Sequence, residues 1–133
     1  MKTAQQTSAK GREQAKALPR VLIAEDEFLI AVMLEDDLRG NGYDVVGPFT
    51  RMREAREAAA SEAFELAVLD INMNGEMAYP IADVLVARGI PFIFLSGYGN
   101  ATLPEQLKGV PCLPKPCDPV QLLAEIRRVL SRQ

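Results

Sequence analysis

The amino-acid sequence predicts an α/β protein with a doubly wound, five-stranded parallel sheet. Three observations carry this prediction. The strand-like segments are apolar at nearly every position, a helical pattern follows each of them, and the two patterns alternate along the chain after Pro19. Strands that are buried on both faces are continuous apolar runs, which is typical of a parallel sheet covered by helices. Five strands and five helices in alternation therefore indicate helices on both faces of one sheet.

The first half of the chain supplies two strand–helix pairs and a third strand. Val21–Ala24 is apolar throughout and predicts the first strand. Phe28–Leu38 has apolar side chains at helical spacing, and Gly40 ends this helix. Tyr43–Phe49 predicts the second strand. We expect Thr50 to cap the next helix, which runs through Met52, Ala55 and Ala59. The apolar run at 66–69 predicts the third strand.

The second half continues the alternation. Pro80–Arg88 predicts a helix that ends before Gly89, and Pro91–Leu95 predicts the fourth strand. Residues 100–109 predict only a short helix, because Pro104 lies inside them. Val110–Leu113 is the fifth strand. We expect Asp118 to cap the final helix with Pro119 at its first position, and the inner face to carry Leu122, Ile126 and Val129.

Length and charge indicate one folded domain with a distinct amino-terminal segment. The 133 residues suffice for a single core. Residues 1–19 are polar and basic, and we expect them to form a flexible tail before a domain at 20–133. The net charge of −3 gives no global bias toward nucleic acid. The chain contains no histidine, which excludes histidine acid–base catalysis and histidine metal ligands.

The expected location is the cytoplasm. No apolar run approaches the roughly 20 residues that cross a bilayer, and the chain does not open with the apolar segment of a secretory signal. We therefore expect no membrane insertion. The two cysteines, Cys112 and Cys117, are not spaced as a Cys-x-x-Cys pair and are interpreted as reduced thiols.

Polar residues follow four of the predicted strands. Glu25, Asp26 and Glu27 follow the first, Asp70 the third, Ser96 the fourth and Lys115 the fifth. The carboxyl ends of parallel strands lie at one edge of the sheet, where ligands bind. Clustered carboxylates repel one another, and a hard cation such as Mg²⁺ relieves that repulsion. Asp70 is then a candidate nucleophile, and Ser96 and Lys115 are candidates to hold a transferred phosphoryl group.

This set of residues resembles the receiver domain of two-component response regulators over residues 20–132. The resemblance implies the (βα)5 flavodoxin-like receiver fold and phosphorylation of Asp70 by a partner histidine kinase. It implies that Glu25, Asp26, Asp70 and the backbone carbonyl of Asn72 bind Mg²⁺. It further implies that Ser96 and Lys115 contact the phosphoryl oxygens, and that the Lys115–Pro116 peptide bond is cis.

A narrower resemblance concerns the segment Pro91–Gly99, which is similar to the "FATGUY" signature of a receiver subgroup from alphaproteobacteria. The segment Asn72–Met77 fits the same subgroup. The pair Leu95-Ser96 stands where the signature usually has Ala-Thr.

Three positions depart from the general receiver pattern. Cys112 stands where a switching aromatic is usual, the stretch from Ser96 to Lys115 is short, and Asn74-Gly75 replaces a common proline. We therefore expect a reduced fourth helix and assign the switching aromatic to Tyr98. The hypothesis is that phosphorylation orders residues 96–108 and changes the exposure of Tyr98.

The leading functional prediction is a single-domain response regulator that is a phosphoacceptor and not an enzyme. It would signal by binding an unidentified downstream protein or by passing on the phosphoryl group, and a weak dimer stays open. One alternative is a phosphatase with an Asp nucleophile, which would want a second Asp where Asn72 stands. A flavin-binding module is disfavoured, because Glu25-Asp26-Glu27 would repel a phosphate. A receiver-like module that works without phosphorylation is the last alternative.

Overall fold

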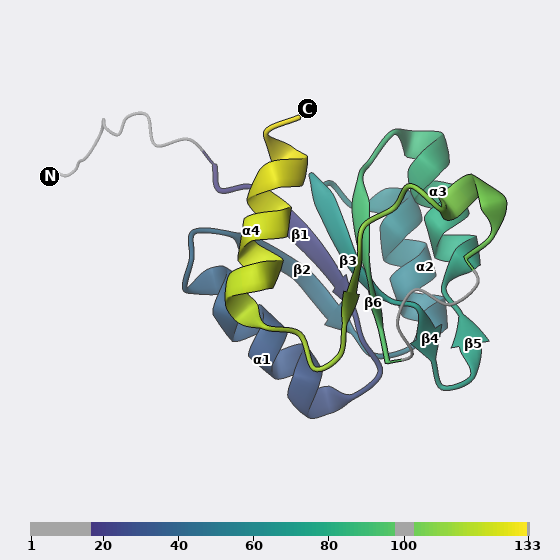
Figure 1. Cartoon of the computed structure of the whole chain (residues 1–133), viewed down its shortest axis with the longest axis horizontal. Coiled ribbons are helices and arrows are strands. Elements are labelled where there is room, and N and C mark those ends of the chain that lie inside the picture. The colour runs from purple at the N-terminus through teal and green to yellow at the C-terminus, as the bar shows by residue number, and fades with distance from the viewer. Residues whose placement is uncertain (1–16, 98–102, 133) are drawn as a thin grey trace, which may run out of the picture.

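A computed structural model describes residues 17–97 and 103–132 as one three-layered α/β fold (Figure 1). The central sheet has five parallel strands in the order β2-β1-β3-β6-β7. They are β1 (Arg20–Ala24), β2 (Asp44–Phe49), β3 (Leu66–Asp70), β6 (Phe92–Ser96) and β7 (Cys112–Pro114). The predicted doubly wound parallel sheet is thereby confirmed. Residues 1–16, which include most of the predicted tail, lie outside the described residues.

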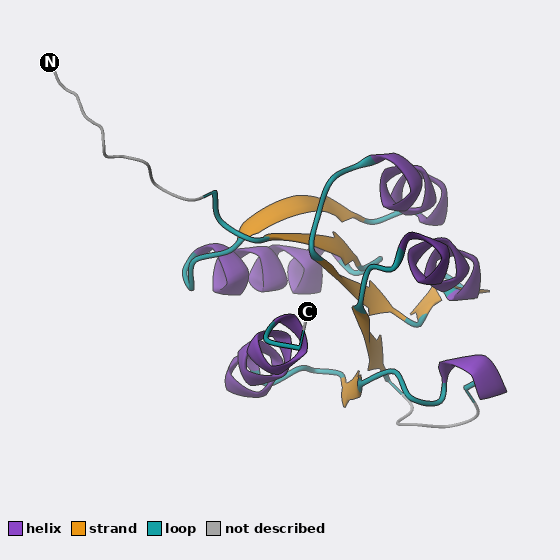
Figure 2. Cartoon of the chain, turned by 90° about the horizontal axis from the view of Figure 1, so that it is seen from above, coloured by secondary structure: helices purple, strands orange, loops and turns teal. Residues whose placement is uncertain are grey.

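Four α-helices in the described part of the chain cover the sheet. They are α1 (Phe28–Arg39), α2 (Met52–Ser61), α3 (Tyr79–Arg88) and α4 (Pro119–Leu130). Figure 2 shows α1 and α4 on one face of the sheet and α2 and α3 on the other. The buried residues accordingly form two clusters, one under each helix pair. None of the helices in these described ranges has the length and apolar character needed to cross a membrane.

The strand cores are buried on both faces, as their composition predicts. Leu22, Val68 and Phe94 in β1, β3 and β6 are each fully buried. The final helix also begins as predicted, because Pro119 is its first residue and the Asp118 carboxylate accepts a hydrogen bond from the Val120 N–H at 3.0 Å. Capping of this kind satisfies a backbone donor that the helix itself leaves free.

Two helix predictions need correction. Thr50 does not cap α2, because Arg51 occupies the capping position in an extended conformation and makes no side-chain capping hydrogen bond. The expected fourth helix at 100–109 is, in the described residues, only a 3₁₀ turn at Glu105–Leu107 that begins directly after Pro104. Proline lacks the N–H that a longer helix through this point would need. Residues 98–102 are outside the description.

The structure also contains a small hairpin that the sequence prediction missed. The strands β4 (Asn72–Met73) and β5 (Glu76–Met77) pair in antiparallel fashion between β3 and α3. Asn74-Gly75 connects them, and this dipeptide between short strands is the strongest local signal for a tight hairpin. The signal was therefore present in the sequence, in the residues that replace the usual proline.

The two cysteines lie on opposite sides of the sheet. Cys112 in β7 packs against the cluster under α2 and α3, whereas Cys117 packs against the cluster under α1 and α4. Both are free thiols. Burial, with the charges of Asp118 and Asp37, raises the pKa of Cys117 to about 11.

Replacing Phe94 by Ala should lower the free energy of unfolding by about 3–5 kcal/mol, because it removes a fully buried ring from the core. The Phe94 ring also makes edge contacts with Tyr79 and Phe92. Val86→Ala is the matched control, since Val86 is 60% exposed, and should change stability by less than about 0.5 kcal/mol. Urea denaturation measures both, and equal effects would contradict this assignment of the core.

Alkylation of Cys117 should be slow at neutral pH. Its thiolate fraction should be about a hundredfold below that of a thiol with a pKa of 9, because the pKa is about two units higher. The rate should rise with pH and reach half its maximum near pH 11. Iodoacetamide labelling with peptide mass spectrometry follows each cysteine separately, and a Cys117 midpoint below pH 9 would refute the shift.

Candidate functional site

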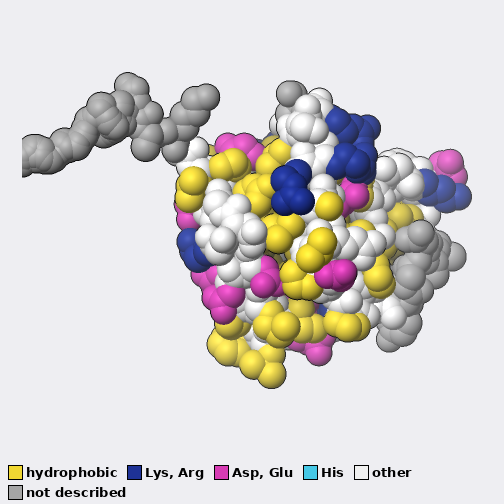
Figure 3. Space-filling view, turned by 60° about the vertical axis from the view of Figure 1, so that its left-hand side comes forward, with side chains coloured by type: hydrophobic (Ala, Val, Ile, Leu, Met, Phe, Trp, Pro, Cys, Tyr) yellow, Lys and Arg dark blue, Asp and Glu magenta, His cyan; other side chains and the backbone are white. Residues whose placement is uncertain are grey.

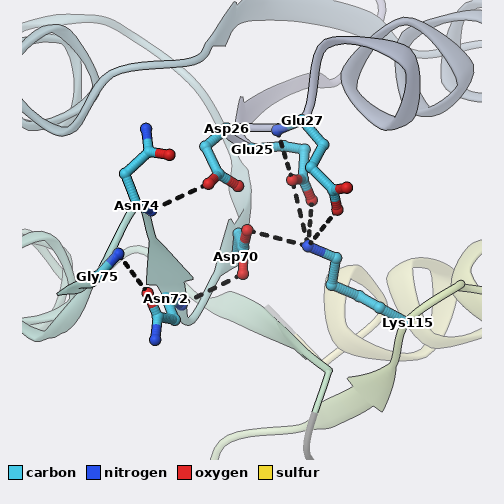
Figure 4. Close-up of polar contacts among 8 residues, drawn as sticks. All are labelled: Glu25, Asp26, Glu27, Asp70, Asn72, Asn74, Gly75 and Lys115. Carbon is cyan, nitrogen blue, oxygen red and sulfur yellow. Dashed lines mark hydrogen bonds and ion pairs between the residues drawn. The ribbon is translucent and has the colours of Figure 1, made fainter.

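The residues that follow the strands surround a pocket of about 630 Å³ at the carboxyl edge of the sheet. Its lining includes Asp26, Glu27, Asp70, Asn74 and Lys115. Figure 4 shows that the side chains of Asp26, Glu27, Asp70 and Lys115 come from the carboxyl ends of β1, β3 and β7 and point toward one another. Parallel strands bring their carboxyl ends to one edge, so residues far apart in sequence meet there.

Glu25 is the most deeply buried charged residue of the site, with no exposed surface. Its Oε2 accepts a hydrogen bond from the Glu27 N–H at 2.9 Å, and the Lys115 ammonium lies 3.2 Å from it. The same ammonium is 3.2 Å from Oε1, yet Oε1 has no hydrogen-bond partner of suitable geometry in the described structure. Burial raises the pKa of Glu25 to about 7.

Asp70 lies at the end of β3 and is 2% exposed. Its Oδ1 accepts a hydrogen bond from the Asn72 N–H at 3.2 Å, and its Oδ2 accepts one from the Lys115 ammonium at 3.0 Å. Burial and the neighbouring Asp26 raise the pKa of Asp70, since both disfavour the carboxylate. The hydrogen bonds from Lys115 and from the Asn72 N–H lower the pKa of Asp70 and so favour its carboxylate form.

Asp26 is less buried than Glu25 and Asp70. The Asn74 N–H donates to its Oδ2 at 2.9 Å. Burial disfavours the charged form of Asp26, but its interactions with Asp70, Glu25 and the Asn74 backbone outweigh burial and lower its pKa. Asp26 is therefore the carboxylate of the cluster that ionises most readily.

Lys115 contacts three carboxylates at once. Its ammonium lies 3.0 Å from Asp70 and 3.3 Å from Glu27, in addition to Glu25. Burial alone would lower the pKa of Lys115, but the charges of Asp70 and Glu25 outweigh it and raise that pKa. The contact with Lys115 adds Glu27, which was not among the predicted site residues, to the site.

The acidic cluster fits a hard divalent cation. Glu25, Asp26 and Asp70 each offer a carboxylate oxygen, and these oxygens lie within 4.8 Å of one another. Among the described residues that line the pocket, Lys115 is the one cation. One ammonium cannot neutralise three or four carboxylates, and oxygen ligands are those that Mg²⁺ prefers. Glu25 Oε1 is buried and makes no hydrogen bond in the described structure, although the Lys115 ammonium lies 3.2 Å from it.

The backbone of Asn72 belongs to the hairpin but is not paired with the residue opposite it. The Ala78 N–H donates to the Ile71 carbonyl at 2.9 Å, which makes these two residues a hydrogen-bonded pair of the hairpin. Pairs alternate along an antiparallel ladder, so Asn72 and Met77 form a non-hydrogen-bonded pair. The backbone polar groups of Asn72 thus face away from Met77, and its N–H indeed reaches Asp70.

Ser96 ends β6 and is 4% exposed. Its carbonyl accepts a hydrogen bond from the Lys115 N–H at 3.0 Å, which holds the two segments together. The Lys115–Pro116 peptide bond is cis, as the resemblance implied. Tyr98, the predicted switch residue, lies outside the described residues.

Known proteins resemble the chain in sequence along most of its length. The family model of the response regulator receiver domain matches residues 21–127. The transcriptional regulatory protein PdtaR of Mycobacterium tuberculosis is 32% identical over 121 residues, which cover 87% of this chain and 59% of that protein. TctD of Salmonella typhimurium is 34% identical over 120 residues, which cover 85% of this chain and 52% of that protein. The chain thus spans about half to three fifths of the length of these curated relatives.

Solved structures agree with the sequence comparison. SdrG from Sphingomonas melonis Fr1 is 34% identical with a TM-score of 0.73, and the match covers 87% of this chain and 98% of that one. The receiver domain of the hybrid histidine kinase CckA is 29% identical with a TM-score of 0.68, covering 84% and 98%. The similarity therefore extends over nearly the whole of each of these two structures.

Proposed function

The chain belongs to the response regulator receiver family, and from this membership we propose that it accepts a phosphoryl group on Asp70 from a partner histidine kinase. Receiver domains are phosphoacceptor signalling domains of two-component systems rather than enzymes. One observation carries the proposal: Asp70 is a buried carboxylate at a strand end, 3.0 Å from a lysine and surrounded by acidic groups.

In the proposed reaction an oxygen of Asp70 attacks the phosphorus of a phosphohistidine. The new O–P bond forms as the P–N bond breaks, and the electron pair stays on the imidazole nitrogen, which takes up a proton from solvent. The reaction requires Asp70 as a carboxylate. The hydrogen bonds from Lys115 and the Asn72 N–H favour that form in spite of the burial of Asp70.

Receiver domains bind Mg²⁺ at an acidic pocket, and we propose that Glu25, Asp26, Asp70 and the Asn72 carbonyl hold it here. When bound, the cation supplies positive charge next to the phosphoryl oxygens. Lys115 supplies a second positive charge, because its ammonium already lies against Asp70. Ser96 would present its hydroxyl to the same phosphoryl group from the end of β6.

The exposed apolar start of α1 is the proposed contact surface for the kinase. Phe28 and Leu29 are 70% and 75% exposed and directly follow Glu27, which lines the pocket. Met33, one turn further along α1, is 62% exposed. Figure 3 shows exposed hydrophobic side chains gathered over this part of the molecule. This surface therefore adjoins the pocket that a phosphoryl donor has to enter.

The phosphatase alternative finds no support in the geometry. Asn72 stands where that chemistry wants an acid, and its Oδ1 accepts a hydrogen bond from the Gly75 N–H at 2.8 Å. The side chain is therefore used in the hairpin turn. A receiver-like module that works without phosphorylation is also less favoured, because the acidic residues, Asp70 and Lys115 all converge on the pocket.

Several finer assignments remain predictions. They are membership of the FATGUY subgroup, cytoplasmic location, a switch at Tyr98, and output through a downstream protein or phosphoryl relay. The PdtaR and TctD relatives are named transcriptional regulatory proteins, and the absence of a nucleic-acid partner is likewise a prediction for this chain.

Asp70→Asn should abolish phosphorylation of the chain, because an amide oxygen is not a nucleophile for phosphorus. The wild-type protein should be labelled by a phosphorylated histidine kinase only when Mg²⁺ is present. Asp83→Asn is the matched control, since Asp83 is exposed on α3, and should be labelled normally. Intact-protein mass spectrometry measures the added phosphoryl group, and labelling of the Asp70 variant would refute the assignment.

Asp26→Asn should weaken Mg²⁺ binding by at least about tenfold, because it removes a charged ligand of the cluster. For the wild type, Mg²⁺ at about 100 times its Kd should raise the free energy of unfolding by about 2.7 kcal/mol. At the same Mg²⁺ concentration the variant should lose about half or more of this gain, yet it should fold in the absence of metal, since the change relieves carboxylate repulsion. Titration calorimetry and urea unfolding test this, with the exposed Asp36→Asn as control.

A further inference from the structure

The tip of the β4–β5 hairpin has a backbone conformation that few L-residues adopt. Asn74 has a φ of 55° and Gly75 a φ of 87°, and Met73 pairs with Glu76 across them. A two-residue hairpin loop with positive φ at both positions is a type I′ turn, which Asn-Gly favours. The Gly75 N–H donates to Asn72 Oδ1 at 2.8 Å, so the Asn72 side chain closes the same turn.

This turn reaches the acidic pocket through its main chain. The Asn74 N–H donates to Asp26 Oδ2 at 2.9 Å and thereby joins the segment after β3 to the segment after β1 (Figure 4). Because the donor is a backbone group, its direction is set by the φ angles of the turn. The identity of the Asn74 side chain matters only insofar as it permits those angles.

We propose that the Asn74–Gly75 turn is a positioning element that orients the Asp26 carboxylate for a divalent cation. The inference rests on the proposed function, which makes Asp26 a cation ligand. Glu25 and Asp70 are held in place by deep burial, whereas Asp26 is only partly buried. Its orientation therefore depends more on the bond from Asn74. Hydrogen bonds that orient a metal ligand in this way are part of the affinity of the site.

A fixed Asp26 also favours one cation over another. Mg²⁺ requires near-ideal octahedral geometry, whereas Ca²⁺ accepts flexible and irregular ligand sets. Loosening Asp26 should therefore weaken Mg²⁺ binding more than Ca²⁺ binding. A turn that served stability alone would change neither affinity in the folded protein.

Gly75→Ala tests the proposal with little steric disturbance, because a Cβ at this position would meet no atom within 4 Å. The only strain is the φ of 87°, which alanine adopts with difficulty. Gly42→Ala is the matched control. Gly42 has a φ of 91°, its Cβ would also meet nothing, and it lies before β2 at the opposite edge of the sheet.

Titration calorimetry with MgCl₂ and CaCl₂ gives the readout, after circular dichroism has verified folding. Gly75→Ala should bind Mg²⁺ about tenfold more weakly, with a reduced preference over Ca²⁺. Gly42→Ala should bind as the wild type does. The Mg²⁺ affinity of Gly75→Asn should lie between those of the wild type and Gly75→Ala, since asparagine tolerates positive φ better than alanine.

Equal Mg²⁺ affinity of the wild type and folded Gly75→Ala would overturn the inference and leave the proposed function intact. Equal losses in Gly75→Ala and Gly42→Ala would also overturn it, because general destabilisation would then explain the effect. If Gly75→Ala does not fold, a Mg²⁺ affinity of Gly75→Asn equal to that of the wild type would overturn the inference instead. Absence of Mg²⁺ binding by the wild-type chain would instead overturn the cation site of the proposed function and this inference with it.

Discussion

The site depends on one electrostatic constraint, which is the confinement of several carboxylates around a single ammonium at one edge of the sheet. Lys115 lies within about 3.3 Å of Glu25, Glu27 and Asp70, and Asp26 is left to the Asn74 backbone. The two most buried acids have raised pKa values because burial disfavours their charged forms. Either a bound cation or bound protons can neutralise the excess negative charge of such a cluster. The stability of the fold therefore depends on the cation concentration and on pH.

The parallel sheet lets the fold hold these charges close together. Each acid or base stands directly after a strand whose interior is buried, so the backbone at the site is held by the sheet on one side. Besides the Lys115 ammonium, the donors that stabilise the carboxylates are backbone N–H groups at Glu27, Asn72 and Asn74. Such donors carry no charge and cost little conformational entropy to arrange, because the adjoining strands already fix them.

The sequence predicts the arrangement of the site better than its local details. Glu25, Asp26, Asp70, Ser96 and Lys115 could be placed together because alternating strands and helices determine which ends meet. The contact of Glu27 with Lys115 could not, since it depends on the rotamer of an exposed side chain. Thr50 was wrong as a cap, because local propensity does not decide which of two neighbouring residues enters the helix. The hairpin was missed although Asn74-Gly75 signalled it, because the dipeptide was interpreted only as a departure from a family pattern.

The division of the core into two clusters has a consequence for how partners share the molecule. Leu107 of the 3₁₀ turn packs with the cluster under α2 and α3, whereas Leu34 and Leu38 of α1 belong to the cluster on the other face. The apolar start of α1 and the segment around Glu105–Leu107 thus belong to opposite layers, with the whole sheet between them. Proteins that bound these two surfaces would therefore contact different layers of the domain.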